Sequence, residues 1–232
     1  MKQMSPDLNR ELNVHDGEVF LVRKPLDWTS FDVVNKIRSI FHIEKIGHAG
    51  TLDKNAAGLL IVCTGKKTKE ISSIQHSEKE YEVTMRLGER TESYDADTPV
   101  TERTDTSLIT EDMIKTNIQK FVGWQTQVPP MWSAGKVAGR RLHAYAREGT
   151  EVERVPREGF IKSIDVQDIS LPDVEMTVVC SKGMYVRSLV HDIGNALGVG
   201  AHVVSLTRSR IGEFRLADAV TIDELIQKVY RN

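Results

Sequence analysis

The feature that most constrains this chain is a loop that carries one carboxylate between glycines and leads into an apolar run. Residues 47–53 read GHAGTLD, and after Lys54–Gly58 the chain continues as LLIVC over residues 59–63. Glycines allow tight turns close to a ligand at little steric cost, and five successive apolar residues predict a strand in a core. We therefore expect Asp53 to be held rigidly beside a buried strand.

Length and charge bound the class of protein. A chain of 232 residues with 40% hydrophobic content is long enough to bury a core as one large domain or two small ones. The formal net charge is only -2, so any RNA contact must come from a local basic patch. Residues 89–112 hold eight acids against two arginines, whereas residues 135–149 hold four basic residues against one acid. The second stretch is a candidate phosphate-contacting surface, and the alternative is a solvated helix face.

The two cysteines, Cys63 and Cys180, each lie in an apolar, strand-like run without a CxxC partner. This pattern indicates reduced thiols that fill a core rather than a disulfide framework or a zinc site. Residues 1–16 form a polar stretch that predicts a loose leader, and no run approaches the roughly 20 apolar residues of a membrane span. We expect a cytoplasmic protein.

Periodicity predicts a mixed order of strands and helices. Ser30 is a plausible N-cap for a helix, Tyr81 to Leu87 alternate as in a sheet with one wet face, and Thr221 to Glu224 form a capping box. The acidic residues 89–106 read as a long connection before a helix capped at Thr110. Strands are expected at 18–23, 59–63, 81–87, 125–129, 159–170 and 174–181, and helices from 30, at 66–76, from 110, at 185–197 and from 221. This pattern favours an α+β fold around a mostly antiparallel sheet.

Motifs for bound cofactors are absent from the sequence. Residues 65–68 (GKKT) are not a phosphate-binding Walker A loop, because Leu60 stands where that motif requires a glycine. There is also no HExxH, no GxSxG and no paired Cys/His spacing. We therefore expect neither a cofactor nor a metal.

Several motifs, in the right order, resemble one family. Residues 47–60 (GHAGTLDKNAAGLL) are similar to GHTGTLDPxATGLL, and residues 180–189 (CSKGMYVRSL) to CSKGTYIRSL, of the bacterial tRNA pseudouridine-55 synthases, the TruB family. The resemblance covers most of residues 17–228 and also includes segments 79–83 (KEYEV), 129–136 (PPMWSAGK), 144–149 (AYAREG) and 200–203 (GAHV).

This resemblance implies a pseudouridine synthase fold, in which a mixed, mostly antiparallel sheet carries a central catalytic cleft. It implies one catalytic domain over residues 17–232, without the PUA domain with which relatives usually continue. The implied activity is isomerisation of uridine to pseudouridine at position 55 in the T-loop of tRNAs. The implied protein is a cytoplasmic monomer that binds the tRNA T-arm and needs no cofactor or obligatory protein partner.

The resemblance also assigns roles to residues. Asp53 matches the catalytic carboxylate, and Arg187 matches the arginine that pairs with it. A free Asp has a pKa near about 3.9, which burial would raise unless a cation such as a guanidinium compensates. Tyr81 matches the tyrosine that lies against the flipped uracil and takes the 2′ proton in the glycal version of the mechanism. Nucleotide contacts are implied for His48, Tyr185 and Leu206. Lys69, Lys136 and Arg147 are candidates for RNA contacts, and the alternative for each is a solvated surface charge.

Four positions depart from the family pattern, namely Ala49 and Ala57 for Thr, Lys54 for Pro and Trp132 for Tyr. None removes a catalytic group, although loss of the proline leaves the loop less restrained.

Two other functions remain open. One is an RNA-binding or tRNA-folding module with little or no turnover, against which an intact Asp53 and Arg187 speak. The other is a synthase for a different RNA, such as a guide-dependent relative.

Overall fold

The computed structural model describes residues 12–230, which form two compact units. The first contains the chain up to Tyr81 together with the segment from Leu206, and the second contains Glu82–Ser205. Two strands, β4 (Lys79–Leu87) and β12 (Ala201–Ile211), contribute residues to both units. Of the loose leader predicted at residues 1–16, residues 1–11 fall outside the described residues, and the prediction is wrong for the rest, because Val14 is buried in the core of the first unit and Leu12 packs against that core.

The first unit is built on the sheet order β1-β3-β12-β4. β1 (Val19–Lys24) runs antiparallel to β3 (Ala56–Thr64), and β12 lies parallel to β3 with Leu206 opposite Ala56. Short β2 (Ile46–His48) pairs with β3, and β13 (Phe214–Arg215) pairs with β12. The strand predicted from the apolar run at residues 59–63 is thus confirmed.

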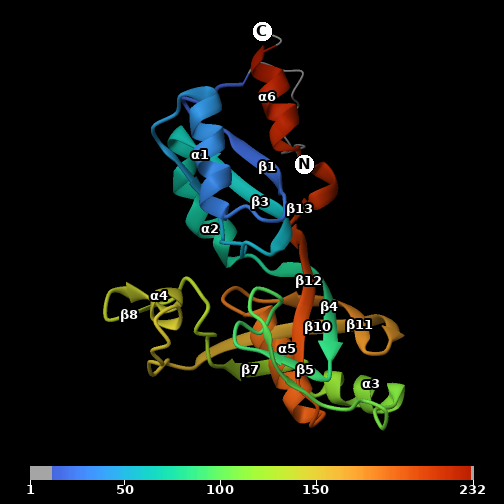
Figure 1. Ribbon diagram of the computed structural model, residues 1–232. Coiled ribbons are helices and arrows are strands. Elements are labelled where there is room, and N and C mark those ends of the chain that lie inside the picture. Colours follow the sequence, from blue (N-terminus) through green and yellow to red (C-terminus); the bar gives the residue numbers. More distant parts are fainter. Residues whose placement is uncertain (1–11, 231–232) are drawn as a thin grey trace. The chain divides into compact units, whose positions relative to one another are not determined.

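Apolar side chains cover both faces of the β1–β3 pair. On one face, α1 (Ser30–Phe41) and α6 (Ile222–Tyr230) lie side by side (Figure 1), and their buried residues pack on Phe20, Val22 and Leu60. The other face packs against Ala49 of the Asp53 loop (residues 49–55) and against Ile74. Ile74 belongs to α2 (Ile71–His76), which follows the 3-10 helix η1 (Gly65–Glu70); a second 3-10 helix, η2, spans Leu216–Asp218. Ala49, the first residue of the Asp53 loop, is therefore part of this core.

Helix caps were predicted with one error. The N-cap of α1 is Thr29, whose hydroxyl accepts from the Asp32 amide while the Asp32 carboxylate accepts from the Thr29 amide. Ser30, the predicted cap, is the first helical residue, and its side chain is buried. The box at Thr221 and Glu224 is confirmed, with bonds of 2.7 Å and 3.2 Å between each side chain and the other's amide.

The second unit has the sheet order β12-β4-β11-β10-β7. β10 (Arg157–Ser170) and β11 (Asp173–Cys180) form a long antiparallel pair, and β7 (Gly123–Gln127) runs antiparallel to β10. The helices α3 (Glu111–Gln119, capped by Thr110) and α5 (Val186–Ala196) belong to this unit (Figure 1). The predicted α+β class with a mixed, mostly antiparallel sheet is confirmed.

Three segments of the chain differ from their sequence-based interpretation. The acidic connection at 89–106 contains a hairpin of β5 (Glu89–Thr91) and β6 (Val100–Arg103). The basic stretch at 135–149 is a hairpin of β8 (Lys136–Val137) and β9 (Arg140–Arg141) followed by the short α4 (Leu142–Ala146). Strand β12 was not predicted at all. Both cysteines are buried and are not joined by a disulfide, in agreement with a core-filling role.

Candidate active site

Asp53 is half-buried in a loop whose consecutive backbone carbonyls accept hydrogen bonds. The Ala49 amide donates to Ile61 of β3, and the Asp53 carbonyl accepts from the Ala56 amide at 3.1 Å. Every carbonyl from residue 50 to residue 54 accepts at least one hydrogen bond from a protein donor. Because buried backbone groups are costly to leave unpaired, this pattern fixes the path of the loop. The rigid Asp53 loop that the sequence predicted therefore has a structural basis.

A buried arginine supplies three of the bonds that hold this region. Arg208 of β12 is only 1% exposed, and its Nη2 and Nη1 donate to the carbonyls of Gly50 and Thr51 at 3.1 Å and 3.4 Å. Its Nε donates to the Leu59 carbonyl of β3 at 2.9 Å. One guanidinium therefore joins the Asp53 loop to the strand that follows it.

Ser30 and Lys24 hold the second half of the loop. The Ser30 hydroxyl accepts from the Leu52 amide at 2.9 Å and donates to the Leu52 carbonyl at 3.1 Å. The fully buried Lys24 ammonium donates to the carbonyls of Pro25, Trp28 and Lys54. Burial lowers the pKa of Lys24 to about 8, and the nearby Asp53 carboxylate acts in the opposite direction. Lys24 thus places positive charge near Asp53.

His48 and Leu206 lie beside this loop, whereas Tyr81 and Lys69 belong to other elements of the first unit. His48 ends β2 directly before it, and burial, together with the Arg208 charge, lowers the pKa of the imidazole, which is therefore neutral at pH 7. Leu206 is buried opposite Ala56, three residues after Asp53. Tyr81 is half-exposed on β4, the strand next to β12. Lys69 is exposed on η1.

Arg187 is the centre of a polar cluster in the second unit. It lies in the first turn of α5, is 3% exposed, and donates at 2.8 Å to the carbonyls of both Ser93 and Trp132. Its Nη1 also lies 3.4 Å from a carboxylate oxygen of Asp95, which is itself buried. The other Asp95 oxygen accepts from the Ser93 hydroxyl and from the Asp97 amide. These contacts fix the guanidinium and balance its charge.

Tyr185 is positioned through its backbone. The side-chain amide of buried Gln127 accepts from the Tyr185 amide at 3.0 Å and donates to the Tyr185 carbonyl at 3.3 Å. Tyr185 is the N-cap residue of α5, and its own side chain is half-exposed. Gln127 therefore holds the start of the helix that carries Arg187.

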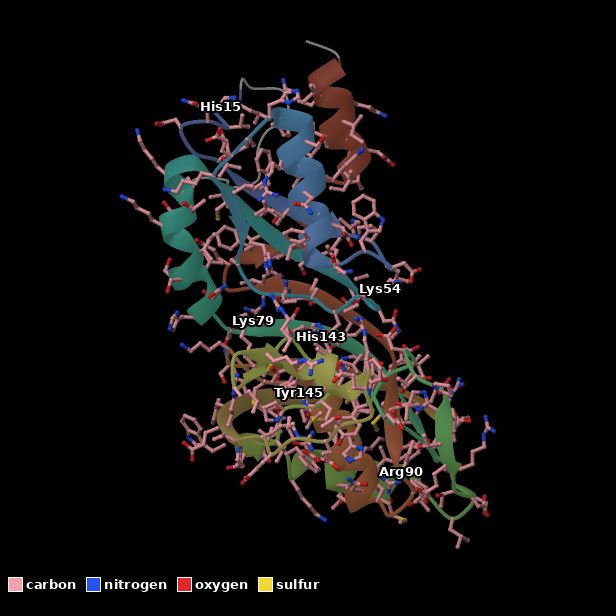
Figure 2. All side chains as sticks on the ribbon, turned by 60° about the vertical axis from the view of Figure 1, so that its left-hand side comes forward. His15, Lys54, Lys79, Arg90, His143 and Tyr145 are labelled. Carbon is pink, nitrogen blue, oxygen red and sulfur yellow. The ribbon has the colours of Figure 1, made fainter. Side chains whose placement is uncertain are left out.

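The basic segment of the second unit presents its charges to solvent. Lys136, Arg141 and Arg147 are exposed and form no ion pair within residues 12–230, whereas Arg140 pairs with Glu148 and covers the Tyr145 ring at 4.7 Å. His143 and Tyr145 belong to α4 (Figure 2). This arrangement leaves three cations available for phosphate.

Sequence reasoning named Asp53 and Arg187 as candidate site residues but did not name the residues that hold them in place. Lys24, Ser30, Asp95, Gln127 and Arg208 have no local pattern that marks them, apart from Ser30, which was interpreted as a cap. Asp53 and Arg187 belong to different units, and their pairing stays a prediction. Residues 12–230 contain no cluster of acidic, His or Cys side chains that could hold a metal, and no helix of that region could span a membrane.

Comparison with known proteins places these elements in a family. Residues 38–186 match the TruB family pseudouridylate synthase (N terminal domain), and residues 187–232 match the tRNA pseudouridylate synthase B C-terminal domain. The chain belongs to the TruB family. Asp53 and Tyr81 lie within the first match, and Arg187 and Leu206 within the second.

Similar TruB proteins cover almost the whole chain. tRNA pseudouridine synthase B of Phocaeicola vulgatus is 43% identical over 220 residues, which are 91% of this chain and 93% of that protein. The protein of the same name from Chloroherpeton thalassium is 42% identical over 93% of this chain and 92% of its own length.

A solved structure also matches the TruB chain. The crystal structure of the archaeal box H/ACA sRNP Nop10-Cbf5 complex contains a chain with a TM-score of 0.70 and 28% identity. The match covers 97% of the present chain and 58% of the chain in that crystal structure. The expected pseudouridine synthase fold is therefore confirmed.

Proposed function

We propose that this protein is a tRNA pseudouridine synthase that converts uridine to pseudouridine at position 55 in the T-loop. The observation that carries the proposal is the Asp53 loop. Its sequence resembles the family motif and keeps the carboxylate, and hydrogen bonds to five consecutive backbone carbonyls hold it in place. The reaction breaks the bond between C1′ and N1 and forms one between C1′ and C5. It changes no oxidation state, so it needs a positioned carboxylate rather than a redox cofactor.

The proposed roles of the residues are those that the family resemblance implies. Asp53 acts on the sugar or the base, by attack at C1′, attack at C6 or the glycal route, and Arg187 keeps its carboxylate ionised and aimed. Extruding a stacked uridine costs a few kcal/mol. Tyr81, Tyr185 and Leu206 offset that cost by contacts with the flipped base, and a neutral His48 fills the space that it leaves.

The test is a direct assay of modification. The purified protein is incubated with an unmodified tRNA transcript, and pseudouridine is mapped by reactivity with a carbodiimide. One modified site, at position 55, is the expected result. Modification elsewhere, or binding without modification, would instead support a synthase for another RNA or an RNA-folding module.

We also propose that RNA contacts come from Lys136 and Arg147, with Lys69 as a further contact. Replacing Lys136 or Arg147 by Gln is expected to reduce the slope of log affinity against log salt by roughly 0.9 each, because one phosphate contact is lost. Lys120→Gln, an exposed lysine at the end of α3, is the control and should leave the slope unchanged. Equal slopes for all three variants would exclude the basic segment as a phosphate contact. Lys69→Gln is measured in the same way.

The proposal extends to a monomeric, cytoplasmic protein. Two buried cysteines that are not joined by a disulfide fit a reducing compartment. Sedimentation of the purified protein alone and cell fractionation test these two points, and a stable oligomer or a membrane fraction would contradict them.

A further inference from the structure

In the described part of the chain Arg208 is, like Lys24, a buried cation whose hydrogen bonds go to backbone carbonyls and not to a carboxylate. Within residues 12–230 its three hydrogen bonds all end on backbone carbonyl oxygens, those of Gly50, Thr51 and Leu59. Moving a guanidinium out of water is costly, and three neutral acceptors compensate for this only in part. A side chain that serves packing alone would not need this charge.

The backbone of Arg208 packs against β3, the strand to which its side-chain Nε also donates. Arg208 lies opposite Gly58 in the parallel register of β12 and β3. Gly58 has φ +110°, and a Cβ atom there would lie 2.4 Å from the Arg208 carbonyl oxygen. Only glycine allows the two strands to approach so closely. The guanidinium therefore starts from a defined position.

The shape of the guanidinium explains why this residue is an arginine. Its two terminal nitrogens reach successive carbonyls of the turn at Gly50 and Thr51, while Nε points to β3. A planar fork can form these bonds at once, whereas a lysine ammonium is a single point of donation. Thr51 is two residues before Asp53, so the fork fixes the backbone that presents the carboxylate.

We propose that Arg208 is a positioning residue for Asp53: it acts on the reaction by holding the Asp53 loop in one conformation, without contacting the RNA. This inference rests on the proposed function, because it assumes that Asp53 is the reacting carboxylate. An error of about 1 Å in the placement of a reacting group costs about 100-fold in rate. Loss of the fork should therefore reduce the chemical step and leave RNA affinity unchanged.

The test compares Arg208→Lys with a matched control, Arg210→Met. Arg210 lies on the same strand. Its replacement by Met removes hydrogen bonds to Glu78, Glu80 and the Gly212 carbonyl but none to the Asp53 loop. Single-turnover pseudouridine formation, tRNA affinity and unfolding free energy are measured for both variants. For Arg208→Lys we expect a rate about 10- to 100-fold lower with affinity within about threefold of the wild type. For Arg210→Met we expect a rate within about threefold, even where stability is lower.

Hydrogen exchange gives a readout that is independent of activity. The amides of Ala49, Leu52 and Ala56 are bonded in the loop and should exchange faster in Arg208→Lys but not in Arg210→Met. Three results would overturn the inference: an unchanged rate in Arg208→Lys, an affinity loss that accounts for the rate loss, or an equal rate loss in Arg210→Met. If the wild type modifies no tRNA, the proposed function fails, and exchange alone decides whether Arg208 holds the loop.

Discussion

Asp53→Asn is expected to abolish pseudouridine formation, with a rate at least about a thousandfold below that of the wild type, because an amide is not a nucleophile or a base. The substitution is nearly isosteric, and it leaves unchanged the five backbone carbonyls of the Asp53 loop that accept hydrogen bonds. The fold and the tRNA affinity should therefore persist, the latter within about tenfold. Single-turnover assays with binding measured on the same preparation check both parts.

The control for Asp53→Asn is the same substitution at Asp223, an exposed carboxylate in the first turn of α6. It removes one negative charge from the same unit and should leave turnover within about threefold of the wild type, because it costs only about 0.3–1 kcal/mol of helix stability. Comparable turnover by Asp53→Asn and the wild type would refute the catalytic assignment.

Arg187→Met should have the second largest effect, on stability as well as on turnover. It removes two hydrogen bonds to carbonyls and leaves the Asp95 carboxylate buried without its cation. Breaking a buried ion pair by removing one partner costs about 3–5 kcal/mol. We expect this loss in chemical denaturation, together with loss of turnover.

A double variant separates the two roles of Arg187. Adding Asp95→Asn removes the unpaired charge and keeps acceptors for Ser93 and for the Asp97 amide, so the double variant should recover part of the stability. Turnover should not recover, because the cation proposed to aim Asp53 is still missing. Recovery of both would make Arg187 purely structural. A salt slope reduced by about one, with turnover intact, would make it a phosphate contact.

Strand β12 shows why part of the fold could not be predicted. Its buried positions include Leu206 and Ile211 but also Arg208. Ser209 and Arg210 are half-buried and form side-chain hydrogen bonds. The apolar alternation that identifies a strand is therefore interrupted by charged residues. By contrast, β4 was predicted because Val83, Met85 and Leu87 keep that alternation and are all buried.

The two residues at the start of α1 show a local error with a distant cause. Both Thr29 and Ser30 are good caps, and sequence preference does not separate them. Thr29 forms the cap with Asp32, and the Ser30 hydroxyl is used 22 residues away, on the backbone of Leu52. The structure therefore gives Ser30 a role in the Asp53 loop that its helix position hides.

The sequence by itself determined the family and most helices and strands, and it supplied the residue proposed to react, because motifs, caps and periodicities lie within a few neighbouring residues. Only the tertiary structure decided what holds those groups in place. Arg208 is 149 to 158 positions from its partners in the chain, and Arg187 is 94 positions from Ser93. Bonds across such separations depend on how strands pair, and no local pattern of side chains encodes that pairing.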